Sequence, residues 1–134
     1  MLPDGLQPTS QYAMHLYQRL GRRAYQGPAL GAAERYRLAA NIASLDGPLL
    51  DNHRVLTAGR SVAEAYMLMH LPERAALAQL RAMAAHGGRI KGVSDELAAL
   101  TCRQWVGDGS ERDGDIEGRV LLCRLRRQSP GNRD

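Results

Sequence analysis

The sequence lacks phenylalanine altogether, and aromatic residues make up only 4% of its 134 residues. A core must therefore be built mostly from Ala, Leu, Val and Met, which bury less area per residue than aromatic side chains do. Only two cysteines occur, Cys102 and Cys123, too few for a disulfide framework and not spaced as a CxxC pair. No run of eighteen apolar residues and no signal-peptide pattern is present. We expect a reduced, cytoplasmic chain with no membrane partner.

The composition is that of one globular domain over residues 1–134, with 44% hydrophobic and 24% charged residues. The formal net charge is +4, and Lys91 is the only lysine. Arginines are spread along the whole chain, and only Arg124, Arg126 and Arg127 form a dense group. Because nucleic-acid modules usually gather their cations on one face, we expect no nucleic-acid partner.

Apolar residues recur at helical spacing in most of the chain. This periodicity predicts helices over residues 12–20, 32–45, 62–71, 72–85, 95–105 and 116–127. The segments "DGPLLDN" and "VLTAG" read instead as turn and strand. The predicted fold class is α/β, mostly helical, with a small sheet around residues 48–58.

The central helices carry two local signals. Ser61 followed by Glu64 fits a capping box, and the nearly continuous apolar run that follows predicts a largely buried helix. Pro72 then either kinks this helix or starts a second one, since proline lacks the N–H that the carbonyl four residues earlier needs. In the last helix we expect three side chains to point inward, those of Val120, Leu121 and Leu125.

The four histidines show no HxH, HxxxH or HExxH spacing, so local sequence alone supplies no metal site. A helix surface or helix end accounts for three of them, His15, His70 and His86. Only His53, in a polar turn between an apolar pair and a β-prone segment, has a context that suits a ligand.

The stretch "LLDNHRVLTAGRSVAEAYMLMHLPERAALAQLRAMA", residues 49–84, resembles the class II aldolase/adducin family, in which a strand, an Asn-His-Gly turn and a helix follow one another. The segments "DGLQPTSQYA", "YQGPALGAAERYRL", "SDELAALTCRQW" and "RDGDIEGRVLLCRLRRQSPGNRD" are similar to the family's flanking parts. The resemblance implies a partial three-layer domain that corresponds to the C-terminal half of the family's head domain.

The resemblance implies that zinc is held by three histidines and that small sugar phosphates undergo aldol cleavage. The family's third histidine corresponds to His53, while its upstream HxH pair, acidic base and phosphate loops have no counterpart here. We therefore expect one metal ligand, His53, and no catalytic residue. Because a catalytic zinc needs three protein ligands and an open position, one imidazole is insufficient.

This sequence departs from the family pattern at a few positions. Arg54 replaces the glycine after the histidine, Pro72 interrupts the long helix, and Gly118 stands where tryptophan is common, which predicts a packing hole. Relatives also place a strand near "LYQRLGRRAY", residues 16–25, where periodicity favours a helix up to residue 20.

Three functional interpretations remain open. The chain is a truncated aldolase-like protein unable to cleave an aldol alone, one part of a split zinc lyase, or a non-catalytic, adducin-like module. In the last two cases its partner is a complementing chain or a second copy in a homo-oligomer.

Overall fold

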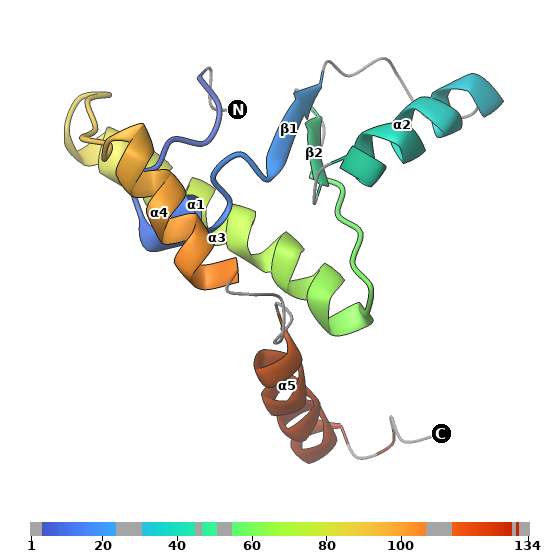
Figure 1. The fold of residues 1–134 in the computed structure, drawn as a ribbon. Helices are drawn as coiled ribbons and strands as arrows, with labels where there is room; N and C mark the ends of the chain where they lie inside the picture. The colour runs from blue at the N-terminus through green and yellow to red at the C-terminus, as the bar shows by residue number, and fades with distance from the viewer. Residues whose placement is uncertain are drawn as a thin grey trace.

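The computed structural model describes residues 4–23, 31–44, 47–50, 55–106, 114–129 and 131. In chain order the elements are α1 (Gln11–His15), β1 (Leu20–Arg23), α2 (Ala32–Ser44), β2 (Gly47–Leu50), α3 (Val62–Ala85), α4 (Asp95–Val106) and α5 (Asp115–Gln128). The mostly helical fold class is confirmed, and Figure 1 shows α3 at the centre with α5 extending away from the other elements. None of the described helices combines the length and apolar character that crossing a membrane requires.

The sheet consists of two parallel strands in the described part of the chain, β1 and β2. Leu20 pairs with Gly47 and Arg23 with Leu50, and α2 provides the crossover that parallel strands need. Pro48 lies within β2, where its missing N–H is tolerated because the strand is at a sheet edge. The predicted sheet position therefore holds for residues 47–50.

Two predictions about this sheet were wrong in their bounds. The helix predicted over residues 12–20 ends at His15, and the chain turns through Gln18 at a φ of 59° into β1. The family resemblance was right to place a strand here, because pairing with a segment far along the chain overrides a short helical pattern. Strand structure after Leu50 is limited among the described residues to a bridge at Val55.

The serine half of the capping box predicted at the start of α3 is confirmed, and the Glu64 carboxylate bonds an amide one residue before the predicted one. The Ser61 hydroxyl accepts a hydrogen bond from the Glu64 amide at 3.1 Å, and the Glu64 carboxylate accepts one from the Arg60 amide. The helix continues through Pro72 to Ala85, so Pro72 does not start a new helix. Pro72 consequently supplies no amide for the carbonyl of Leu68, four residues earlier.

The core lies between α1, α3 and α4. Its buried apolar side chains are Ala13, Leu16, Leu68, Leu71, Ala75, Ala98 and Cys102. Gln79 of α3 is also buried, and its amide donates to the Gly5 carbonyl at 3.1 Å and accepts from the Gln7 amide at 2.8 Å. These two bonds hold residues 4–10, here called the N-terminal arm, against α3.

Glycine allows α5 to approach the first turn of α3. A Cβ on Gly118 would lie 2.6 Å from the Ala63 Cβ, and one on Gly114 would lie 2.5 Å from the Ala63 carbonyl oxygen. The packing hole expected at Gly118 is therefore absent, because the two helices are close enough to fill that space. The inward placement of Val120 and Leu125 was wrong, since they are 63% and 44% exposed.

Candidate functional site

The predicted metal ligand, His53, and the adjacent Arg54 lie outside the described residues. The chain is described up to Leu50 at the end of β2 and again from Val55. His53 therefore belongs to the connection between a strand of the sheet and the start of α3, the order of elements that the family resemblance implies.

The segment after this connection is fixed to the start of α3. The Thr57 hydroxyl donates to the Ala65 carbonyl at 3.1 Å, and a Cβ on Gly59 would lie 2.5 Å from the Ala65 amide nitrogen. Contact with α3 explains why this β-prone segment is not a continuous strand. The sequence signals strand propensity here but does not reveal the packing partner.

Among the described residues, Glu64 is the buried carboxylate nearest in sequence to this connection, and it is engaged in structural contacts. Besides the Arg60 amide, it pairs with the Arg60 guanidinium at 3.2 Å, and the residue is only 8% exposed. A carboxylate engaged in a helix cap and an ion pair is a poor candidate for proton transfer. We therefore assign Glu64 to the stability of the α3 start.

The other histidines are in separate places. His15 is buried at the end of α1, with its ring stacked on Trp105 at a centroid distance of 5.4 Å. His70 stacks on Tyr66 at 5.9 Å, and His86 caps the C-terminus of α3. The helix-end prediction for His15 holds, but a surface position does not.

Within the described ranges, no three His, Cys, Asp or Glu side chains gather in an arrangement that could hold a metal ion. A catalytic zinc requires three protein donors, and His53 would supply one. The described residues therefore do not fit a complete zinc site, so a metal bound at His53 would need donors from elsewhere.

Sequence reasoning missed a polar contact between the α1–β1 turn and α4. A hydrogen bond to Asp95 raises the pKa of Tyr17, and partial desolvation and the Asp95 charge act in the same direction. The phenol therefore stays protonated near neutral pH and is a hydrogen-bond donor, not a base. A cavity of about 250 Å³ lies beside it, and Asp4 and Gln18 also line that cavity.

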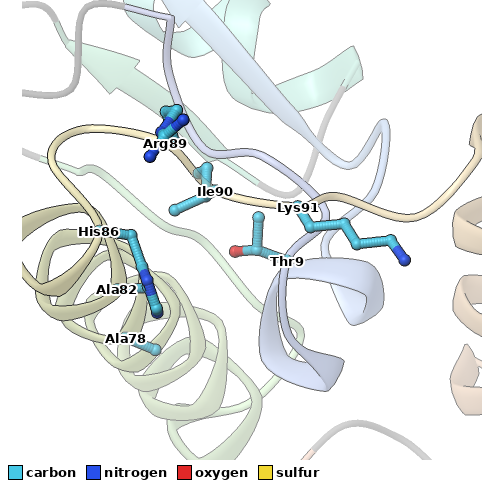
Figure 2. Close-up of a pocket in the computed structure, with 7 residues that line it drawn as sticks. All are labelled: Thr9, Ala78, Ala82, His86, Arg89, Ile90 and Lys91. Carbon is cyan, nitrogen blue, oxygen red and sulfur yellow. The ribbon is translucent and has the colours of Figure 1, made fainter.

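A larger pocket, of about 540 Å³, lies at the C-terminal end of α3. Figure 2 shows its lining, which consists of Thr9, Ala78, Ala82, His86, Arg89, Ile90 and Lys91. The basic side chains suit the partial negative charge of a helix C-terminus. The sequence contains a signal for this basic cluster: His86, Arg89 and Lys91 lie within six positions, directly after the predicted end of the helix at residue 85.

Comparison with known proteins identifies the family. No family model matches the chain. It is 31% identical over 136 residues to a Pseudomonas aeruginosa protein named after the class 2 aldolases, and 30% identical over 131 residues to one from Caulobacter vibrioides. An aldolase II superfamily protein from Pseudomonas syringae superimposes with a TM-score of 0.86 at 30% identity, over 99% of this chain. The chain belongs to the class II aldolase family.

This class II aldolase chain spans about half the length of the curated relatives that it matches, 51% in both cases. It likewise covers 53% of the Pseudomonas syringae protein. L-fuculose 1-phosphate aldolase from Glaciozyma antarctica shares the fold, with a TM-score of 0.71 at 20% identity over 45% of that chain. The class II aldolase fold is thus preserved over a stretch that corresponds to half of a relative.

Proposed function

We propose that this chain is one half of a class II aldolase domain and supplies His53 as one ligand of a shared zinc site. The remaining ligands and the proton-transfer residue would come from the part of the domain that this chain does not cover. In this proposal the 134 residues form a single folding unit but an incomplete site. The observation that carries it is the preserved fold over half of a relative's length.

We propose aldol cleavage of a small sugar phosphate as the activity of the completed domain. Support comes from the structural neighbour named L-fuculose 1-phosphate aldolase, whose fold this chain shares over 45% of that protein. Zinc, when bound in such a site, acts as a Lewis acid on an oxygen of the substrate. The role of this chain would be to hold one imidazole at the end of β2 and to fix the following segment on α3.

A non-catalytic, adducin-like module for association is the second candidate. It is favoured by α5, which contacts α3 at its first turns but carries four large apolar side chains that are between 44% and 63% exposed: Ile116, Val120, Leu122 and Leu125. A self-associating chain whose association needs α5, and which never binds zinc in any mixture, would support this candidate.

We also propose a reducing, cytoplasmic location. Cys102 and Cys123, the only two cysteines of the chain, form no disulfide bond, and the buried Cys102 thiol donates to the His15 carbonyl at 3.3 Å. This thiol fills a core position and needs no oxidised partner.

The proposal is tested by complementation. The chain is mixed with the segment of the Pseudomonas aeruginosa relative that it does not match, and zinc affinity and cleavage of L-fuculose 1-phosphate are measured. We expect both signals in the mixture and neither from the chain alone. His53→Ala should abolish them, whereas His86→Ala, at the other end of α3, should leave both unchanged.

Two results would contradict the proposal. One is stoichiometric zinc binding with aldol cleavage by the chain alone. The other is a complemented mixture in which His53→Ala and His86→Ala behave alike.

A further inference from the structure

The helix α3 is apolar on two separate faces. Its inner face, formed by Leu68, Leu71, Ala75 and Gln79, is buried against α1 and the N-terminal arm. A second line of residues, here called the outer stripe, consists of Val62, Tyr66, Met69, Glu73, Leu77, Leu80 and Ala84. A helix with apolar residues around most of its circumference is normally buried on all sides.

The outer stripe runs along almost all of α3. Its members are three or four residues apart, the spacing that keeps side chains on one side of a helix. On average the stripe advances eleven residues in every three helical turns. This repeat is close to that of an undistorted α-helix, so the stripe runs nearly parallel to the helix axis. From Val62 to Ala84 it is about 33 Å long at 1.5 Å per residue.

The large apolar members of this stripe are open to solvent. Val62 is 89% exposed, Leu80 51% and Tyr66 48%, and Met69 and Leu77 are each 39% exposed. The α5 helix contacts α3 on a different side, because Gly114 and Gly118 meet it at Ala63 and Met67, which are not in register with the outer stripe. Figure 1 likewise shows α1 and α4 together on one side of α3.

A second copy of the chain is a poor occupant for this surface. Glu73 lies midway between Val62 and Ala84, and it is exposed. In a twofold-symmetric pairing with full overlap of two stripes, Glu73 would therefore face Glu73 of the other copy. Two carboxylates brought together in a desolvated interface repel each other, which opposes such a dimer.

The uncovered half of the domain is the better occupant. The Pseudomonas syringae protein matches this chain over 53% of its length, and the remaining residues must share a core with the matched part if they form one layered domain. We propose that this remaining half docks on the outer stripe of α3 and places a cationic or hydrogen-bond-donating group opposite Glu73. The inference rests on the proposed function and deepens it by naming the surface where completion takes place.

The test measures binding of the full 134-residue chain to the unmatched segment of the Pseudomonas aeruginosa relative, in EDTA, by isothermal titration calorimetry. Leu77→Asp should weaken binding at least about 100-fold, because it buries a charge without a partner. Leu77→Met should change it less than about 3-fold, because volume is conserved. Leu122→Asp on α5, which also places a charge at a half-exposed leucine, is the matched control and should have no effect.

Glu73 provides a second, charge-specific arm of the test. We expect Glu73→Lys to weaken binding by at least about 30-fold and Glu73→Gln by less, because the lysine ammonium has no acceptor for the opposing donor, whereas the glutamine carbonyl still accepts a hydrogen bond. Arg74→Glu, one residue away and also exposed, should leave binding unchanged.

Chemical labelling covers the case in which a charged variant fails to fold. Met69→Cys, introduced in a Cys123→Ser background, should react with a maleimide at least about 10-fold more slowly once the complementing segment is bound. Unchanged labelling in the bound mixture would overturn the proposal.

The outcomes separate this inference from the proposed function. Binding that depends on the outer stripe, in a mixture that never holds zinc, would support docking and contradict the proposed function. If the mixture cleaves the substrate but binding between its two parts is insensitive to Leu77→Asp and Glu73→Lys, the docking proposal would be overturned and the proposed function would stand. Absence of binding by the wild-type chain, or a dimer of the chain alone that Leu77→Asp disrupts, would also overturn the docking proposal.

Discussion

The two faces of α3 have similar side chains but different surroundings. Leu68 on the inner face is 1% exposed, whereas Leu77 on the outer stripe is 39% exposed. The inner face is covered by elements of this same chain, so its contacts contribute to the stability of the chain in isolation. The outer stripe gains its contacts only if something else covers it. The difference separates residues that fold this half from residues that complete the domain.

The largest expected effect is on the inner face. Leu68→Ala should lower the free energy of unfolding by about 3 kcal/mol, since it removes buried methyl groups and leaves a cavity. Leu77→Ala should lower it by less than about 1 kcal/mol, because that side chain is already partly solvated. Urea unfolding of both variants measures the contrast. Equal losses would mean that the outer stripe is also packed within the isolated chain.

A smaller effect is expected at Gln79, the polar member of the inner face. Gln79→Ala leaves the Gly5 carbonyl and the Gln7 amide without this partner and should cost about 2 kcal/mol. Hydrogen exchange at the Gln7 amide should accelerate as the arm loosens. Gln104→Ala, at an exposed position of α4, serves as the control and should change neither quantity. An unchanged exchange rate in Gln79→Ala would refute the fastening role.

Where α3 contacts α5, substitutions at Gly118 and Ala63 should have interdependent effects on the free energy of unfolding. Gly118→Ala places a methyl group against Ala63, and the clash should exceed the gain in helix propensity, for a net loss of about 1 kcal/mol. Combining it with Ala63→Gly should recover a coupling energy of about 1 kcal/mol or more. Additive losses in the thermal unfolding of the two single variants and the double variant would argue against this close approach.

The smallest effect is electrostatic and lies on α4, away from both faces of α3. Hydrogen bonds from its own amide and from Ser94 lower the pKa of Glu96. Its contribution to stability is therefore fully present above the unfolded-state pKa and is lost as pH falls through the lower folded-state pKa. In an NMR titration, Ser94→Ala should raise the pKa of Glu96, whereas Thr101→Ala should not. No change in Ser94→Ala would exclude the bond from Ser94.

Local signals in the sequence predicted much of this fold. The serine cap at Ser61, the end of α3 at Ala85 and the start of α4 at Asp95 all depend on contacts within a few residues. For the same reason α2 and α5 were placed within two residues of their bounds. Such signals can be recognised in the sequence because the residues that interact are neighbours in the chain.

Contacts between distant segments were not predictable in this way. The strand β1 exists because residues 20–23 pair with residues 47–50, and periodicity alone favoured a helix up to residue 20. The apolar run in α3 predicted a buried helix but could not tell the inner face from the outer stripe. His53 was singled out by its turn and by family resemblance, and its role as a metal ligand stays a prediction.

The most direct test of the central claim is the X-ray absorption spectrum of zinc bound to a mixture of this chain and the unmatched segment of the Pseudomonas aeruginosa relative. The account predicts a shell with three imidazole ligands that forms only when both parts are present and loses one ligand in His53→Ala. The same three-ligand shell formed by this chain alone, or a shell unchanged in His53→Ala, would contradict it.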